Sequence, residues 1–284
     1  MGTYIVRRLI QAAATLFFLS IVFFVLSRLQ PGGSCSTYGV TAAGCLATQN
    51  LDQPIANQYL IWIGDLLHGN FGISTGGQPV GTIILQGLPP TVVLVGVSLF
   101  IQQAIALPLG IFAALRPYSA ADQGLTFGSY VALSIPAFAL GYVLINLFTL
   151  QWNLLPPGHY EDPAIPLLFT SGWFSAFWQN PGYVLGDLIH HLILPAFALT
   201  VTGIAIDSRF MRAAMLQVLH QDYIRTAKAK GLTRRRIVFK HAFRNALLPI
   251  ITNLGLYLPA LIGGVVAVEF VFTFGGLGYE FSQA

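Results

Sequence analysis

The chain has 284 residues, of which 55% are hydrophobic and 8% are charged, and its mean hydropathy is +0.70. Because a soluble domain carries about 25% charged residues, this composition excludes an ordinary soluble protein and predicts an all-α membrane protein, a polytopic helical bundle. The net charge of +4 does not indicate nucleic-acid binding, since the positive residues follow the pattern expected of membrane topology.

The basic residues are concentrated in one part of the chain. Ten of the 14 lie between Arg209 and Arg244, and the segments 29–115 and 117–208 contain none. Cytoplasmic loops carry an excess of Lys and Arg, so both segments are expected to lie mainly outside the cell or within the bilayer. The remaining four are Arg7, Arg8, Arg28 and Arg116.

The first predicted span is Leu9–Leu29, an apolar run of about the 20 residues that a spanning helix needs. A cleaved signal peptide is the alternative, but the run is too long for one and no small-residue cleavage site follows it. We therefore expect a retained helix with its N-terminus in the cytoplasm. Residues 30–90 then form an external region, in which the amphipathic stretch Asn57–Gly69 lies along the membrane surface or packs on the bundle.

Both cysteines, Cys35 and Cys45, lie in this external region. In an oxidising compartment we expect them to form a disulfide, and two unrelated buried thiols are the alternative. Two cysteines without further ligands nearby are too few for a metal site, so no metal is predicted.

The second span is predicted over Thr91–Leu115, beginning just after two consecutive prolines. It contains Gln102 and Gln103, and polar amides within hydrocarbon should face the interior of the bundle. There they either line a transport pathway or make structural hydrogen bonds between helices.

Residues 116–122 form a short inner turn that leads into a third predicted span, Leu125–Leu150. Pro136 interrupts this span close to Ser134. Such breaks are tolerated where neighbouring helices satisfy the freed carbonyl group, and they are common in transport bundles. We therefore count Ser134 with the two glutamines as a candidate for the pathway lining.

Residues 151–187 form the second predicted external loop, which is rich in proline and aromatic residues. The aromatic side chains are typical of interfacial anchors, and a lid that contacts substrate or a delivery protein is the alternative. Asp187, His190 and His191 have the spacing of a metal site on one helical face, but histidine is ordinary at a membrane interface and we predict no metal there.

Two further spans are predicted, Leu192–Gln217 and Leu247–Phe272. Charged residues at the inner end of the fourth span are expected to pair or to reach the headgroups. They are Asp207, Arg209 and Arg212. Near the outer end of the fifth span, Glu269 either pairs across the bundle, as a candidate pathway residue, or reaches the headgroups.

Residues 217–244 form a polar region, predicted to be cytoplasmic. Its first helix is expected to run from Asp222, as the N-cap, to Lys230, with Gly231 as the stop. A second helix begins after Thr233, and Pro249 breaks or kinks it. Three arginines crowd the start of this second helix, where the helix dipole disfavours cations, so lipid phosphates or an acidic partner should favour them. They are Arg234, Arg235 and Arg236.

The sequence contains no motif of an enzyme active site. It has no G-x-x-x-x-G-K-[ST] nucleotide loop, no H-E-x-x-H zinc motif and no G-x-S-x-G nucleophile turn. No cofactor is predicted. If the chain drives uphill transport, ATP must be hydrolysed by another polypeptide.

Two C-terminal segments carry a family resemblance. Residues 222–249, DYIRTAKAKGLTRRRIVFKHAFRNALLP, and residues 265–281, VVAVEFVFTFGGLGYEF, resemble the inner-membrane permease subunits of ABC importers for dipeptides, oligopeptides and, in some members, nickel. The likeness continues through IVRRLIQ, YLIWIGDLLHGNFG, ALRPYSAADQ, LSIPAFALG and HHLILPAFAL. It implies a single transmembrane permease domain over residues 1–284, in the cell membrane. It also implies a second homologous permease, two ATPase subunits, an extracytoplasmic binding protein and a peptide substrate.

The resemblance further implies that the first helix of the polar region docks in a groove on an ATPase subunit. Tyr223, Ile224 and Ala227 are the expected apolar anchors in this groove, with Arg225 and Lys228 at its rim. The coupling residues predicted in this way are Asp222, Tyr223, Ile224, Arg225, Ala227, Lys228 and Gly231.

The sequence departs from the family pattern at three places. Arg225-Thr226-Ala227 stands where importer permeases in general have Glu-Ala-Ala, and Pro31-Gly32-Gly33-Ser34 replaces Pro-Gly-Asp-Pro. The family normally has a sixth span, whereas five are predicted here before Ala284; we expect truncation or an omitted helix rather than a functional five-helix form.

Three alternatives to peptide import stay open. One is an importer of the same build for nickel or another solute. An ion-gradient-driven carrier is the second, and the scarcity of acidic residues at the span centres disfavours it. The third is a passive membrane anchor, which the broken and polar-spotted spans disfavour.

Overall fold

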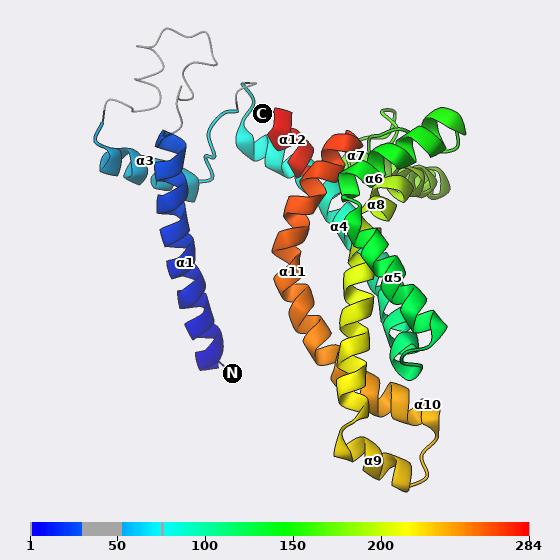
Figure 1. The fold of residues 1–284 in the computed structure, drawn as a ribbon. Helices are drawn as coiled ribbons and strands as arrows, with labels where there is room; N and C mark the ends of the chain where they lie inside the picture. The colour runs from blue at the N-terminus through cyan, green and yellow to red at the C-terminus, as the bar shows by residue number, and fades with distance from the viewer. Residues whose placement is uncertain (1, 30–52, 75–76, 284) are drawn as a thin grey trace. The chain divides into compact units, whose positions relative to one another are not determined.

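The computed structural model of the chain describes residues 2–29, 53–74 and 77–283, with the backbone alone for 256–264. Throughout these ranges the regular structure is helical, apart from one isolated bridge between Ile73 and Pro79 (Figure 1). The predicted all-α fold is therefore confirmed. The predicted pairing of Cys35 with Cys45 lies outside the described residues. The chain divides into two compact units, one reaching Ile83 and one running from Ile84 to Gln283.

The first unit contains α1 (Gly2–Leu29) and α3 (Ile55–Leu67). As predicted for the first span, α1 is long and apolar enough to cross a membrane. α3 packs against it, with the hydroxyl groups of Ser20 and Tyr59 2.8 Å apart and the Phe24 ring 5.5 and 5.6 Å from the rings of Tyr59 and Trp62. Of the two arrangements predicted for this amphipathic stretch, the structure shows packing on a spanning helix.

The second unit holds most of the chain. Its first helices, the first of which begins shortly before the unit boundary, are α4 (Val80–Leu115), α5 (Ala120–Ser134), α6 (Ala137–Leu144), the π-helical η1 (Ile145–Gln151), α7 (Ser171–Gln179) and α8 (Pro181–Leu219). The polar region and the C-terminal part form α9 (Asp222–Ala229), α10 (Arg234–Arg236), the π-helical η2 (Ile237–Ala242), α11 (Phe243–Val271) and α12 (Leu277–Gln283).

Within the described ranges, three helices meet the length and hydropathy expected of a membrane span, namely α1, α4 and α8. α5 with α6 and η1 forms a fourth candidate that is bent by 89°. The bend lies at Ile135 and Pro136, between the end of α5 and the start of α6, where the sequence predicts a break. α11 covers the fifth predicted span.

Two helix boundaries that the sequence predicts at prolines differ in the structure. α4 does not begin after Pro89 and Pro90 but includes both, because its first turns are held by packing: a Cβ on Gly87 would lie 3.0 Å from the Leu277 backbone nitrogen. Of the break or kink predicted at Pro249, the break is absent, because α11 continues through this residue. Residues on both sides of Pro249 are buried in one apolar cluster, so tertiary contacts outweigh the local preference of proline.

The second unit has two apolar clusters, one towards each end of α8. The first joins α6, α7, the first half of α8 and the end of α11, and includes the fully buried Phe272 and Phe274. The second joins the ends of α4 and α8 to α9, η2 and the start of α11. Figure 1 shows α9 and α10 at the far end of α8 from α6 and α7. This second cluster positions α9, which carries the residues that the sequence predicts to couple the chain to an ATPase subunit.

Candidate functional site

The loop helix α9 ends in a complete Schellman motif. The Leu232 N–H donates to the Ala227 carbonyl oxygen at 3.3 Å, and the Gly231 N–H donates to the Lys228 carbonyl oxygen at 3.0 Å. Gly231 has φ +75°, a left-handed conformation that glycine adopts without a steric cost, as the sequence predicts for a helix stop. The start differs by one residue, since Gln221 rather than Asp222 is the N-cap. The turn after α9 is therefore fixed by backbone hydrogen bonds.

α9 turns its apolar face towards the body of the protein, and this corrects one expectation. Ile224 is 0% exposed and Ala227 is 7% exposed, and both belong to the cluster that includes Met211 and Met215 of α8. Neither side chain is available to anchor in a groove on another protein. Tyr223 is 42% exposed and keeps a surface on which a partner could bind. The two buried residues instead attach α9 to the spanning helices.

Polar contacts tie the same region to two other helices. The Tyr223 hydroxyl accepts a hydrogen bond from the Asn245 side-chain amide of α11 at 2.8 Å. Arg234 donates to the carbonyl oxygen of Leu115, the last residue of α4, at 3.2 Å. The negative end of the α4 dipole therefore favours one of the three arginines that crowd the start of the following helix. The sequence predicts that lipid phosphates or an acidic partner favour these arginines, whereas for Arg234 a carbonyl group of the same chain does so.

A cavity of about 600 Å³ lies between this loop and the end of α4. Its lining combines apolar residues with four basic ones. The basic residues are His220, Arg225, Lys228 and Arg234. Arg225 also lies 3.7 Å from Asp222, but both side chains are largely exposed, so this ion pair adds little to stability. The exposed side of the α9 region is thus positively charged.

The glutamines of α4 contact a carboxylate of α8. Gln102 is 1% exposed and donates from Nε2 to Oδ2 of Asp207 at 2.6 Å, and Gln103 donates to the same oxygen. Asp207 is itself buried and has no basic partner among the described residues. Of the two interpretations given for Gln102 and Gln103, this geometry favours the interhelical hydrogen bond.

Ser134, the candidate pathway residue in the bent span, does not contact Gln102 or Gln103. The Ser134 hydroxyl donates to the Tyr130 carbonyl oxygen within α5 at 2.8 Å, and the residue is exposed. The structure therefore brings Gln102 and Gln103 together at Asp207 but leaves Ser134 apart from them.

Glu269 pairs across the bundle and does not reach the surface. It is 0% exposed, and its carboxyl group accepts hydrogen bonds from the Thr91 hydroxyl at 2.5 Å and from the backbone N–H groups of Gly278 at 2.7 Å and Tyr279 at 3.3 Å. Thr91 in turn accepts from the Leu277 N–H at 2.8 Å. The carboxyl group thus joins the start of α12 to α4, which excludes the headgroup alternative.

We expect Glu269→Ala to release α12, whereas Glu269→Gln should keep most of its contacts. A glutamine oxygen can still accept from the two backbone N–H groups. Alanine leaves both unpaired, at a cost of about 1 to 3 kcal/mol for the buried Gly278 N–H and less for the partly buried Tyr279 N–H. Hydrogen exchange at Gly278 and Tyr279 measures the difference. Equal protection in the two variants would show that this carboxyl group does not hold α12.

The segment between η1 and α7 packs on the turn after α11. The His159 N–H donates to the Phe272 carbonyl oxygen at 3.0 Å, and a Cβ on Gly158 would lie 2.3 Å from the same oxygen. Further along, the carboxyl group of Asp187 accepts from the Asp162 N–H at 2.8 Å. These contacts fix the loop to the helices.

Asp187, His190 and His191, which have the spacing of a metal site, contact different partners in the structure. One Asp187 carboxylate oxygen lies 3.4 Å from Nδ1 of His191, whereas His190 lies 3.1 Å from the Leu154 carbonyl oxygen. Within the described residues, no group of three ligands that could hold a metal is present.

Glu161 is a buried carboxylic acid in this loop. It is 7% exposed, and neither oxygen makes a well-aligned hydrogen bond to a described residue. The pKa of Glu161 is raised to about 7, chiefly by burial. The Tyr160 hydroxyl offsets part of this rise, the nearby Asp187 carboxylate adds to it, and the Trp173 indole N–H lowers it slightly. No pattern in the sequence predicts this residue, because its burial depends on the tertiary packing of the loop.

The stability of this loop should therefore fall as the pH rises. Between the ordinary pKa of 4.5 and the folded value of about 7, the folded state keeps a proton that the unfolded state has released, so each step up in pH favours unfolding. Thermal unfolding of the purified protein should occur at a higher temperature near pH 5 than near pH 8. Glu161→Gln should reduce this difference, and an unchanged pH profile in that variant would contradict the assignment.

An ion pair joins α5 to α8. The sequence predicts that Arg212 pairs or reaches the headgroups, but it does not identify Asp122 as the partner. Arg212 donates to both oxygens of Asp122, from Nε at 2.5 Å and from Nη2 at 2.6 Å. Asp122 also accepts from the Tyr118 N–H at 2.8 Å, in the turn between α4 and α5. The two residues are 90 positions apart, so only the antiparallel packing of the two helices brings them together.

Comparison with known proteins agrees with this architecture. Residues 106–284 match the family described as "Binding-protein-dependent transport system inner membrane component". The chain is 39% identical over 289 residues to the "Oligopeptide transport system permease protein AppB" of Bacillus subtilis (strain 168), covering 99% of this chain and 86% of that protein. It is 33% identical to the "Dipeptide transport system permease protein DppB" of Escherichia coli (strain K12), covering 97% and 85%. For the "Di/tripeptide transport system permease protein DppB" of Pseudomonas aeruginosa (strain UCBPP-PA14), the identity is 35% and the coverage 98% and 86%.

The family model matches more than half of the chain, and relatives above 30% identity match nearly all of it. Both findings are consistent with the apolar spans and with the packing of α9 against the ends of α4 and α8. The protein is thus a multi-pass membrane protein of the transport class. The chain belongs to the family of binding-protein-dependent transport system inner membrane components.

Proposed function

We propose that the chain is a permease subunit of an ATP-driven ABC importer of dipeptides or oligopeptides, and that it forms half of a translocation pathway. The names of its relatives support peptides over nickel as the substrate class. The observation that carries the coupling role is the burial of Ile224 and Ala227 of α9 against α8. A loop helix attached in this way moves with the spanning helices.

The proposed topology follows the distribution of basic residues. The N-terminus and residues 217–244 lie in the cytoplasm, because residues 217–244 contain eight of the 14 Lys and Arg and the N-terminal segment contains Arg7 and Arg8. Residues 30–90 and 151–187, which contain no Lys or Arg, lie outside. An extracytoplasmic binding protein delivers the peptide on that side, and a second homologous permease completes the pathway.

Two ATPase subunits supply the energy, and one of them contacts the exposed side of α9. This side carries Tyr223, Arg225 and Lys228, while Ile224 and Ala227 hold the helix from behind. Movement of α9 passes to α8 through the apolar cluster and to α11 through the bond between Tyr223 and Asn245. With a rigid connection of this kind, rigid-body motion of the helices can open the translocation pathway to one side of the membrane or the other without a change of fold. The chain itself hydrolyses no ATP.

Reconstitution tests this proposal. The chain is incorporated into proteoliposomes with its second permease and ATPases, the binding protein is added outside, and uptake of a radioactive dipeptide is measured with and without ATP. We expect uptake that requires ATP and all subunits. Uptake of nickel instead of peptide would identify the other branch of the family, and uptake driven by an ion gradient without ATP would overturn the proposal.

A further inference from the structure

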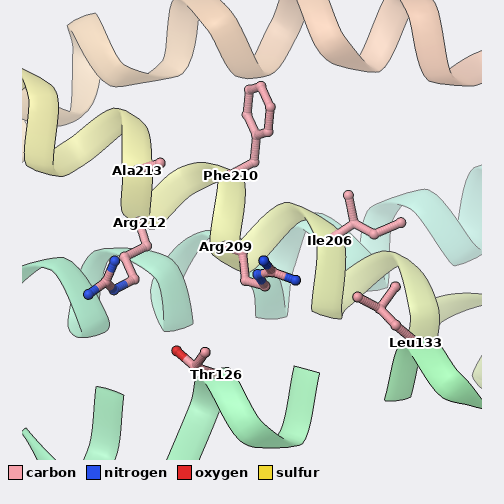
Figure 2. A pocket seen from close by; sticks show the side chains of 7 residues that line it. All are labelled: Thr126, Leu133, Ile206, Arg209, Phe210, Arg212 and Ala213. Carbon is pink, nitrogen blue, oxygen red and sulfur yellow. The ribbon is translucent and has the colours of Figure 1, made fainter. Parts of the chain in front are cut away.

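A groove of about 470 Å³ lies between α5 and α8, on the side of the unit where α9 is attached. We call it the α5–α8 groove. Figure 2 shows Arg209 and Arg212 pointing from α8 to the side where Thr126 of α5 lies, whereas Phe210 points to the opposite side of α8. Its lining residues are Thr126, Leu133, Ile206, Arg209, Phe210, Arg212 and Ala213.

The groove carries one uncompensated positive charge. Arg212 is neutralised by its two hydrogen bonds to Asp122. Arg209 is exposed; its guanidinium group lies 4.5 Å from the centre of the Tyr130 ring and donates to the Tyr130 hydroxyl at 3.3 Å. It has no acidic partner within ion-pair distance in the described part of the chain. Arg209 is thus held in place by an aromatic ring and left free to bind an anion.

The position of Arg209 along α8 places it at a membrane interface. Eighteen residues separate it from His191, the last polar residue before the apolar part of α8, which corresponds to about 27 Å along a helix. The hydrocarbon core of a bilayer is about 30 Å thick. If His191 lies at one boundary of this core, Arg209 therefore lies near the headgroups at the opposite boundary. This is the boundary on the side of α9.

The lining changes from charged to apolar along the groove. α5 and α8 run in opposite directions, so Leu133 near the end of α5 and Ile206 before Arg209 both lie nearer the middle of the membrane than the ion pair between Asp122 and Arg212. A ligand that fits has an anionic group at the interface and an apolar part directed towards the bilayer centre.

We propose that the α5–α8 groove binds an acidic phospholipid, whose phosphate pairs with Arg209 and whose acyl chain lies along Leu133 and Ile206. A guanidinium group is suited to phosphate because its donors match two oxygens at once. A transported peptide fits less well, because its free amino group would need an acid, and the carboxylate of Asp122 beside the groove is already paired with Arg212. This proposal does not depend on which solute the protein transports.

Native mass spectrometry tests the proposal on the complete transporter. The complex is released from bilayers of phosphatidylglycerol and phosphatidylcholine, and the retained lipids are counted. We expect phosphatidylglycerol to be retained preferentially, with an affinity about fivefold lower in Arg209→Ala. Lys240→Ala removes an exposed charge outside the groove and should leave the retention unchanged. Leu133→Trp fills the apolar part without altering charge and should also weaken retention.

Two results would overturn the proposal. One is equal retention of phosphatidylglycerol by the unaltered protein and by Arg209→Ala, with thermal stability of the variant showing that it is folded. The other is a photo-crosslinker at Leu133 that labels a second permease subunit instead of lipid. In that case the groove is a protein interface.

Discussion

Replacing Ile224 with aspartate is expected to abolish ATP-dependent peptide uptake while the protein still inserts into the membrane. Ile224 is fully buried in the cluster that joins α9 to α8, and an unpaired charge at such a position costs about 3 to 5 kcal/mol. The helix should therefore detach from the cluster, while the apolar spans that direct insertion are unchanged. Uptake into proteoliposomes and the membrane fraction of the expressed protein measure the two effects.

The matched control is Ala229→Asp, which places the same charge on the exposed side of α9. It should leave the thermal stability of the purified chain unchanged, whereas Ile224→Asp lowers it. If both variants unfold at the same temperature as the unaltered protein, the burial of Ile224 does not hold α9. Normal uptake in Ile224→Asp would remove the coupling role from this helix.

Replacing Asp122 with alanine is expected to lower the free energy of unfolding by about 3 kcal/mol. The change leaves Arg212 without its acceptor at a site where the Asp122 side chain is 4% exposed and that of Arg212 is 26% exposed. It also removes the acceptor for the Tyr118 N–H, in a turn where Tyr118 has the left-handed φ of 63°. Thermal and denaturant unfolding in detergent measure the loss.

Two further variants separate the ion pair from its surroundings. Asp122→Leu combined with Arg212→Met removes both charges at similar volume and should recover part of the stability, since neither charge is then left unpaired. Asp222→Ala removes the acid of the exposed pair with Arg225 and should have no measurable effect. A double variant no more stable than Asp122→Ala would show that the pair itself is not the source of the loss.

Much of the fold could be predicted because its signals are local. The apolar run of α1 and the break at Pro136 are written in consecutive residues, and so is the stop at Gly231, which the structure shows with φ +75°. The starts and ends of helices near proline were predicted less well. Pro89 lies inside α4 and Pro249 inside α11, because packing against distant segments outweighs the local preference of proline at these positions.

The partners of the polar residues could not be predicted. The sequence predicts that Gln102 faces inward, but its hydrogen bond to Asp207 joins residues 105 positions apart. The same limit applies to Glu269 and Thr91, which are 178 positions apart. The clearest error concerned Ile224: an amphipathic helix shows which residues share its apolar face, but not whether that face meets the same chain or another one. Burial in the structure answers this question.

The close approach of α4 and α8 restricts how this half of a transporter can change shape. A Cβ on Gly110 would lie 2.5 Å from the Ser208 carbonyl oxygen, and one on Gly203 would lie 2.0 Å from Oε1 of Gln102. Two glycines, one on each helix, therefore interlock with the opposite helix, and sliding by a single turn would drive side chains into them. The two helices must therefore move together, as one rigid unit.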